Sequence, residues 1–244
     1  MKVHVLGCGD AFGSGGRNQS GYLVAARDRL FLIDCGPTSL LALKRAGFSP
    51  AALDAVFISH LHGDHFGGLP FFFIDALYAN ARPKPLIIAG PAGTEPRARA
   101  LFDIMYGAGP EPKALPPTVF HVLHPEQSAT IVGIEVFPFA VPHQARGTPL
   151  GLKFAYEGKQ ILFSGDASWT ELFVRHARGV DLFLCECCFF AEESATHMSY
   201  KTLARNLSRL ECKRLILTHL GEEMLARRAE LAVESAYDGM IIEL

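Results

Sequence analysis

Short apolar runs alternate with helix signals along the chain, and this alternation predicts an α/β protein. Strands are expected at residues 2–6, 22–24, 30–33, 54–58, 86–91 (strand and turn), 118–122, 129–132, 134–139, 150–156, 160–163, 182–185, 215–217 and 240–242. Helices are expected at about residues 38–46, 70–81, 94–106, 170–178, 199–210 and 221–237. Each half of the chain holds several strands and helices. We therefore expect one domain, residues 1–244, in which two sheets pack between helix layers as an αββα sandwich.

Composition narrows the class of protein. Of 244 residues, 49% are hydrophobic and 20% are charged, and the net charge is −2. Such a chain can bury a sizeable core, and it is not a general binder of polyanions. No apolar run has the length of a membrane span, and the N-terminus lacks the features of a signal peptide, so we expect a soluble, cytoplasmic protein. None of the six cysteines forms a Cys-x-x-Cys pair, which favours reduced, structural thiols.

The glycine-rich stretch at residues 7–16 needs separate consideration because glycine-rich loops can hold phosphates. Its spacing does not match a Walker loop, and the strand at 22–24 follows it instead of a helix. We interpret it as a loop at a sheet end that permits close backbone approach. Arg17, beside Asn18 in this region, is a candidate contact for a phosphate.

Polar residues follow the apolar strand runs repeatedly, and they are histidines and carboxylates. Three histidines and an aspartate come directly after the strand at 54–58, and similar residues end later strands: His60, His62, Asp64, His65, His143, Asp166, Glu186 and His219. Strand ends are where ligand-binding groups collect in α/β sheets. Imidazole and carboxylate are ligands of zinc and related divalent ions, so this set predicts a metal site.

This spaced set resembles the metallo-β-lactamase superfamily of dinuclear metallohydrolases, over almost the whole chain. The resemblance implies that one metal is held by His60, His62 and His143. It implies a second metal held by Asp64, His65 and His219, with Asp166 bridging the two. True β-lactamases of this fold place a cysteine near the bridging position, and the aspartate here argues against that branch.

Within the superfamily, the chain is similar to the ribonuclease Z group and its phosphodiesterase relatives. The similarity rests on five segments: residues 17–20, 33–36, 59–70, 196–199 and 215–219. In that group the histidine that matches His197 helps to protonate the leaving oxygen. The candidate catalytic residues are therefore Asp64, His197 and Glu186, the last of which could orient His197 or a water. Asp34 could accept a hydrogen bond from a ligand histidine.

Three of these residues also have plain structural explanations. His197 could be a surface histidine at a helix start, Asp34 a turn residue, and Glu186 a satisfied polar residue at a strand end. The basic residues Lys201, Arg205 and Arg209 recur on one helix face, which favours a solvated surface over a phosphate contact.

One departure from ribonuclease Z bears on the substrate. That enzyme inserts a long arm, used to grip transfer RNA, between the residues that match His143 and Asp166. Here only residues 144–165, 22 in number, separate them. Without the arm, and with a net charge of −2, processing of transfer RNA is not expected as the main activity.

We therefore expect a dinuclear metal-dependent hydrolase, a phosphodiesterase acting on a small or cyclic phosphodiester or on an RNA 3′ end. Two divalent ions are implied, with zinc favoured over manganese or iron, because bound ions make hydroxide available near neutral pH and neutralise phosphoryl charge. The alternatives are a lactone, thioester or other ester hydrolase with the same metals, and a metal-binding protein without catalysis. No stable protein partner is implied beyond a homodimer, which the group often forms and for which Phe71–Phe73 would suit an interface.

Overall fold

The computed structural model describes residues 1–244, and its first sheet is built mostly from the first half of the chain. The strand order is β14-β1-β2-β3-β4-β5-β6. The strands from β3 to β6 pair in parallel, and the others pair antiparallel. Their bounds are β1 (Lys2–Gly7), β2 (Gly21–Ala25), β3 (Leu30–Ile33), β4 (Ala55–Phe57), β5 (Leu86–Gly90), β6 (Thr118–Val122) and β14 (Ile241–Glu243).

The second sheet has the order β13-β12-β11-β10-β9-β8-β7. Its strands pair antiparallel from β7 to β10 and in parallel from β10 to β13. The bounds are β7 (Ala129–Ile131), β8 (Ile134–Ala140), β9 (Leu150–Tyr156), β10 (Lys159–Phe163), β11 (Leu182–Glu186), β12 (Leu215–Thr218) and β13 (Glu234–Ser235). The expected hairpin of β9 and β10 is confirmed, with Tyr156 opposite Lys159.

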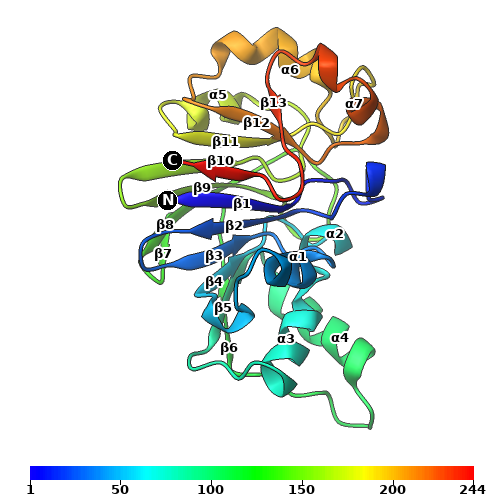
Figure 1. Ribbon diagram of the computed structural model, residues 1–244, viewed down its shortest axis with the longest axis vertical. Coiled ribbons are helices and arrows are strands. Elements are labelled where there is room, and N and C mark those ends of the chain that lie inside the picture. Colours follow the sequence, from blue (N-terminus) through cyan, green and yellow to red (C-terminus); the bar gives the residue numbers. More distant parts are fainter.

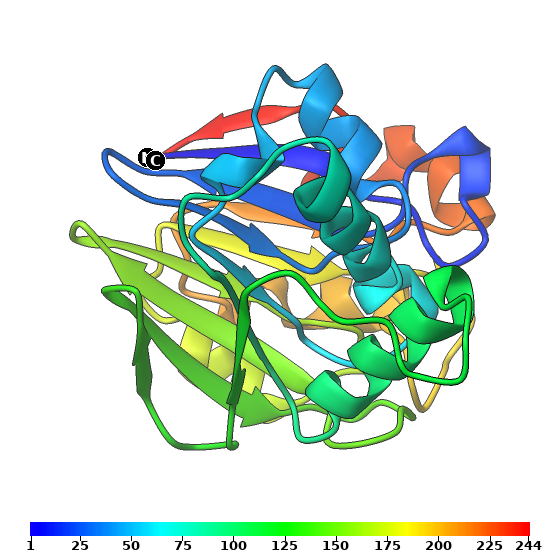
Figure 2. The same ribbon diagram turned by 90° about the horizontal axis from the view of Figure 1, so that it is seen from below.

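Helices cover the outer face of each sheet, so the αββα sandwich is confirmed (Figures 1 and 2). The first sheet carries α1 (Ser39–Arg45), α2 (Gly63–Phe66), α3 (Leu69–Tyr78) and α4 (Thr94–Tyr106). The second carries α5 (Glu171–Ala177), α6 (Tyr200–Asn206) and α7 (Glu222–Ala226). Short 3₁₀ turns complete the chain: η1 (Ser14–Gly16), η2 (Pro50–Ala52), η3 (Leu207–Arg209) and η4 (Arg228–Glu230). None of these helices is long and apolar enough to cross a membrane.

The central strands are buried on both faces, which explains why they read as continuous apolar runs. In β4, Phe57 packs into the cluster between the sheets, while Val56 packs under the first helix layer. In β11, Leu184 faces the same central cluster and Phe183 faces the second helix layer. The alternation places three apolar layers between four layers of secondary structure and leaves the strand ends free to carry polar groups.

Two expectations about this fold are wrong. The predicted helix from Gly221 to about Tyr237 ends at Ala226, because the chain must return to the sheet, where Glu234 pairs beside Ile216. The Phe71–Phe73 run does not form an apolar surface. Phe72 and Phe73 are 3% and 0% exposed in the core beneath the first helix layer, so they give the expected homodimer no support.

The connection that carries the long arm in ribonuclease Z is short here. Residues 141–149 join β8 to β9, and Glu157 and Gly158 form the tight turn of the hairpin that follows. Both turn residues have positive φ, 50° and 73°. The 22 residues are thus used up by one loop and one hairpin, and no arm projects from this part of the chain.

Candidate metal centre

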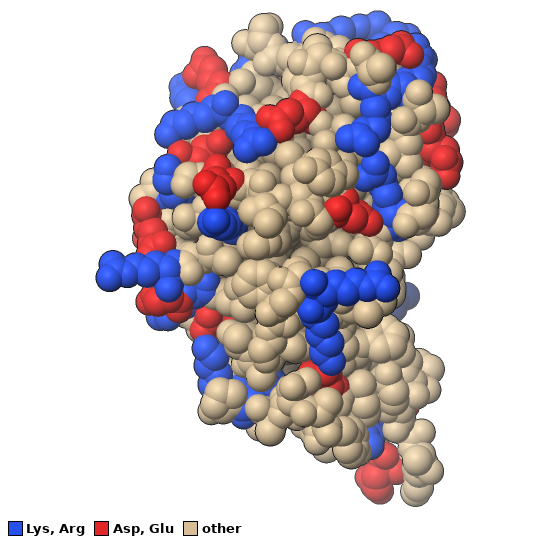
Figure 3. All heavy atoms as spheres, in the orientation of Figure 1, with Lys and Arg blue, Asp and Glu red and all other residues tan.

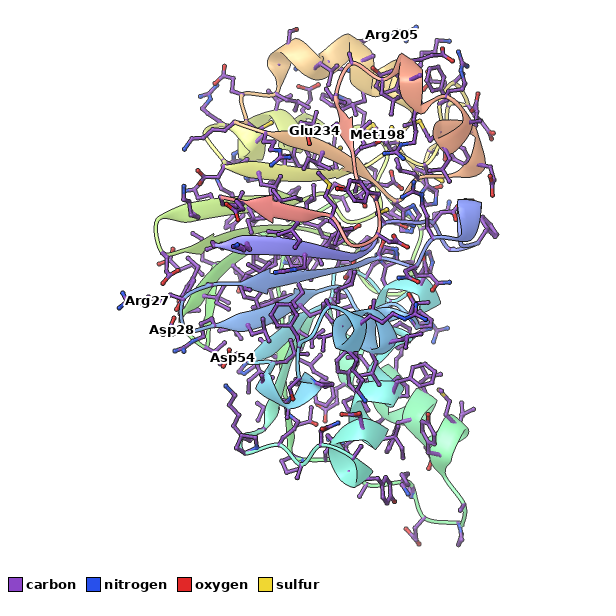
Figure 4. All side chains as sticks on the ribbon, viewed as in Figure 1. Arg27, Asp28, Asp54, Met198, Arg205 and Glu234 are labelled. Carbon is purple, nitrogen blue, oxygen red and sulfur yellow. The ribbon has the colours of Figure 1, made fainter.

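The seven predicted metal ligands meet at one end of the two sheets. Four of them lie between β4 and the end of α2, and the others follow β8, β10 and β12. In Figure 1 this end lies near the labels of α2 and α7, away from the two chain termini. Figure 4 labels Arg27 and Asp28, which mark the opposite edge of the sandwich at the β2–β3 turn.

The first group consists of three imidazole nitrogens. His60 Nε2 is 3.2 Å from His62 Nδ1, and His143 Nε2 is 3.1 Å from the same nitrogen. All three nitrogens lie within 4.8 Å of one another. The convergence of three imidazole nitrogens on one point is typical of a metal-binding triad.

The second group consists of two carboxylates and two imidazoles. His65 Nε2 is 3.1 Å from Asp64 Oδ2 and 3.2 Å from Asp166 Oδ1. His219 Nε2 is 3.3 Å from Asp64 Oδ2 and 3.3 Å from Asp166 Oδ2. The same Asp166 oxygen is 3.7 Å from His60 Nε2, so this carboxylate lies between the two groups, where a bridging ligand would be.

His65 supplies a test of whether a divalent ion fits the second group. Its Nδ1 donates a hydrogen bond to Asp34 Oδ2 at 2.7 Å. In the neutral ring Nε2 therefore carries a lone pair, and that atom is buried without a hydrogen-bond donor. The lone pair faces carboxylate oxygens of Asp64 and Asp166. A cation between these acceptors removes the conflict, so the residues fit a metal.

The electrostatics of the two groups differ. Burial lowers the pKa of His60, His62 and His143, and these rings are therefore neutral and ready to bind. In the second group, burial lowers the pKa of His219 but Asp166 and Asp64 raise it more, to about 9. Without a metal, a proton thus occupies the second group at neutral pH.

Asp34 accepts hydrogen bonds from the loop that follows β4 and thereby fixes its position. It is fully buried and accepts hydrogen bonds from Ser59 N–H at 2.7 Å, Ser59 Oγ–H at 2.8 Å and His65 Nδ1–H at 2.7 Å. Its φ of 56° turns the chain sharply after β3 so that the carboxylate reaches under that loop. The predicted hydrogen bond between Asp34 and a candidate ligand histidine is present in the structure.

Two contacts that orient candidate ligands were missed by sequence reasoning. Ser59 Oγ lies 3.0 Å from His60 Nδ1, and His143 Nδ1 donates to the carbonyl oxygen of Thr196 at 2.7 Å. Ser59 could have been noticed because it directly precedes the histidine motif. Thr196 acts through its backbone, which leaves no signal in the residue type.

His197 and Glu186 lie at the edge of the centre and touch each other. His197 Nδ1 is hydrogen-bonded to a Glu186 oxygen, and the other Glu186 oxygen accepts from the backbone N–H of Met198. Met198, labelled in Figure 4, lies beneath α6 on the side of the second sheet. The His197 ring stacks on His219 at 5.6 Å and meets His143 at 4.9 Å between centroids, so it borders both groups.

The remaining candidates from the sequence are Arg17 and the six cysteines. The guanidinium of Arg17 donates to the carbonyl of Ala236 at 3.3 Å and lies 3.1 Å from the sulfur of Cys8, and both contacts use the same nitrogen, Nη1. A phosphate contact by Arg17 stays a prediction. All six cysteines are unpaired, and Cys188 is the one whose sulfur lies near the centre, within 4.8 Å of His197 and His219 nitrogens.

Comparison with known proteins identifies relatives over the whole chain. A family model described as Anti-Pycsar protein Apyc1 matches residues 1–235. Ribonuclease Z of Parabacteroides distasonis is 31% identical over 160 residues, a match that covers 65% of this chain and 50% of that protein. This chain therefore spans half the length of that relative.

Two solved structures share the architecture. The metallo-β-lactamase fold protein YhfI from Bacillus subtilis has a TM-score of 0.78 at 24% identity and covers 99% of both chains. The short form of human tRNase Z has a TM-score of 0.80 at 23% identity, with 100% of this chain and 99% of that one covered. At these identities the likeness shows the fold alone.

The predicted superfamily and its ribonuclease Z-like branch are therefore confirmed, by relatives along the chain and by the fold. The family model extends over nearly the whole sequence and includes all seven candidate ligands. The chain belongs to the Anti-Pycsar protein Apyc1 family, and it is a metal-dependent hydrolase of the metallo-β-lactamase fold.

Proposed function

We propose that the chain is a dinuclear metal-dependent phosphodiesterase whose substrate is a cyclic nucleotide. The observation that carries the proposal is the pair Glu186–His197, placed at the edge of two adjoining ligand groups. Ligand groups of this kind serve many hydrolases, but a leaving alkoxide needs a proton donor, and this pair is positioned to provide it. The family description, Anti-Pycsar protein Apyc1, points to a cyclic nucleotide as the phosphodiester.

In this proposal His60, His62 and His143 hold one divalent ion, Asp64, His65 and His219 hold the other, and Asp166 contacts both. The donor set of imidazoles and carboxylates suits zinc, with manganese or iron as alternatives. When bound, such ions lower the pKa of water and offset charge on phosphoryl oxygens. The chain contributes the fixed positions of these donors, which the hydrogen bonds to Asp34, Ser59 and Thr196 maintain.

Glu186 and His197 act as one proton-holding unit in this proposal. Burial raises the pKa of Glu186 and lowers the pKa of His197. Because the two groups are in direct contact, one proton shared between them is more stable than either an unpaired anion or an unpaired cation. His197 Nδ1 faces Glu186, so its other nitrogen, Nε2, is the atom that can deliver the proton to the leaving oxygen.

The surface agrees with a small substrate better than with a long polyanion. On the face drawn in Figure 3, basic and acidic side chains are interspersed. The net charge is −2, and no arm extends between β8 and β9 to hold an RNA. Cleavage at an RNA 3′ end is the second candidate, favoured by the relative named ribonuclease Z. Hydrolysis of lactones, thioesters or other esters is the third, and it does not require a proton donor as strongly.

A substrate panel with a matched pair of variants tests the proposal. We expect hydrolysis of one or more cyclic nucleotides, weaker hydrolysis of bis(p-nitrophenyl) phosphate, and little action on precursor transfer RNA or lactones. His197→Ala should lower turnover of cyclic nucleotides roughly 100-fold or more without loss of bound metal. The control, His121→Ala, changes an exposed histidine on β6 and should have no effect.

The outcomes separate the candidates. Undiminished turnover in His197→Ala would remove the proton-donor role, and preferential hydrolysis of lactones would replace the phosphodiesterase proposal. Efficient cleavage of precursor transfer RNA would favour the second candidate. Metal content, measured on the same samples, shows whether a lost activity reflects lost chemistry or lost metal.

A further inference from the structure

The loops that follow β10 and β11 form a small open cavity beside His197. These two strands are parallel, so both loops leave the same edge of the second sheet, where ligands bind in α/β proteins. The cavity has a volume of about 210 Å³, and its lining includes His197, Trp169, Glu193 and Ser194. Met198, labelled in Figure 4, also lines it. Because the His197 ring borders both ligand groups as well, the cavity adjoins the proposed proton donor.

Trp169 gives the cavity a flat aromatic surface whose position is fixed. Its indole N–H donates to Glu171 Oε1 at 3.1 Å, and its ring meets Phe173 edge-on at 6.2 Å between centroids. The guanidinium carbon of Arg209 lies 5.9 Å from the ring centroid. Trp169 is nevertheless partly exposed, so a ligand in the cavity can reach it. Aromatic rings of this kind stack on nucleobases, because every base has a π-face.

Glu193 gives the cavity a hydrogen-bond acceptor. One of its carboxylate oxygens accepts from the Thr202 hydroxyl at 2.8 Å, in the first turn of α6, and the other oxygen makes no hydrogen bond. No lysine or arginine lines the cavity. A phosphate is therefore unfavourable at this position, whereas a neutral group that donates N–H hydrogen bonds is favourable.

We propose that this cavity is the nucleobase subsite and that it favours bases with an exocyclic amino group, such as cytosine, over uracil. The inference rests on the proposed phosphodiesterase function. The leaving oxygen belongs to the ribose and must lie at His197, so the base extends from the ribose into the adjoining cavity. There the base stacks on Trp169, and its amino group donates to the free oxygen of Glu193. Uracil carries a carbonyl oxygen in place of the amino group of cytosine, so two acceptors would face each other.

Trp169 is the only tryptophan of the chain, so its fluorescence reports directly on this subsite. We expect cytidine monophosphate to quench the emission of the metal-loaded enzyme, and ribose 5-phosphate, which lacks a base, to leave the emission unchanged. Calorimetry on the same samples gives the affinities. Trp169→Leu should weaken the binding of cytidine monophosphate roughly 10-fold or more and leave the affinity for ribose 5-phosphate unchanged. A nucleotide that binds without any change of the Trp169 emission would overturn the subsite.

Glu193→Gln tests the choice of base. The native enzyme should bind cytidine monophosphate roughly 3- to 10-fold more tightly than uridine monophosphate, which corresponds to one hydrogen bond. A glutamine amide can donate as well as accept, so in Glu193→Gln the ratio of the two affinities should fall to about one. Glu192→Gln is the matched control, since this neighbouring glutamate is exposed and lies outside the cavity; it should keep the native ratio. Equal affinities for the two nucleotides in the native enzyme would contradict the role of Glu193.

Binding and turnover together distinguish failure of the subsite from failure of the proposed function. Quenching of Trp169 with a preference for cytidine monophosphate, but no hydrolysis of any cyclic nucleotide, would refute the proposed function and leave the subsite intact. Hydrolysis of the cyclic monophosphates of cytidine and uridine with equal kcat/KM would overturn the subsite and leave the proposed function intact.

Discussion

Replacement of Asp34 by asparagine removes the negative charge of this buried side chain but preserves its size. Asparagine is similar in size and readily adopts positive φ, so the backbone conformation at φ 56° is preserved. The three groups that donate to Asp34 are the Ser59 amide, the Ser59 hydroxyl and His65 Nδ1, at 2.7, 2.8 and 2.7 Å. Either orientation of the amide places its NH₂ against at least one of these donors.

The magnitude follows from those contacts. With the amide oxygen toward the Ser59 N–H, the NH₂ group faces the Ser59 hydroxyl, which can rotate, and His65, which must change tautomer. A hydrogen bond to a buried charged group contributes about 1.5–3 kcal/mol, so the free energy of unfolding of the metal-free protein should fall by about 2–4 kcal/mol. The new His65 tautomer places a proton on Nε2, so Zn²⁺ affinity should fall roughly 10- to 100-fold.

Two measurements on Asp34→Asn check this reasoning. Chemical denaturation in excess chelator gives the change in the free energy of unfolding, and competition with a chromophoric chelator gives the affinity for Zn²⁺. Asp103→Asn is a control at a partly buried position of α4, away from the centre, where the side chain also accepts a backbone N–H. Retention of two Zn²⁺ equivalents with native affinity in Asp34→Asn would show that His65 does not depend on Asp34 for its tautomer.

The pKa of His219 is raised from 6.5 to about 9, so its protonated ring stabilises the metal-free protein fully below about pH 6.5, and this stabilisation is lost as the pH rises through 9. Denaturation in chelator should show that the free energy of unfolding falls by about 3 kcal/mol over this range, and the fall should be absent with Zn²⁺ bound. Gly7→Ala places a Cβ 2.0 Å from a backbone oxygen and should lower the free energy of unfolding by about 2–4 kcal/mol, whereas Gly109→Ala, with no atom within 4 Å, should not. Glu186→Gln removes the negative charge that holds the proton on His197 and should lower turnover roughly 100-fold with normal metal content, as measured by steady-state kinetics and metal analysis.

The strands and the candidate ligands could be predicted because the apolar residues of a strand and the polar residues that follow it are neighbours in the sequence. Each central strand is apolar on both faces, and the residue that leaves the sheet is where the polarity changes, as at Ile58 to His60. The seven candidate ligands follow this pattern and converge in the structure. Their roles as ligands, the single domain, the homodimer and the cytoplasmic location stay predictions.

Features that depend on distant partners could not be predicted. The segment after Ala226 has helix-forming residues, but its place is decided by the edge of the second sheet, where Arg214 forms an ion pair with Glu234 at 2.7 Å. The acceptor for His143 is a backbone carbonyl that lies 53 residues away in sequence. The direction of the Ser59 hydroxyl depends on two partners, one of them 25 residues earlier in the chain.

The backbone conformation at the strand ends determines which of these positions can change their chemistry over evolution. At Asp34 and His219 the side chain that acts in the centre belongs to a residue whose own φ is positive, 56° and 55°. Substitutions there must satisfy both chemistry and conformation, so a saturation library should tolerate few residue types beyond asparagine, aspartate, histidine and glycine. After β10 the strained conformation is carried by Gly165 instead, with φ 61°. Asp166 is therefore free of this conformational constraint, and exchange of its donor atom for one on a side chain of similar size should leave the backbone there undisturbed.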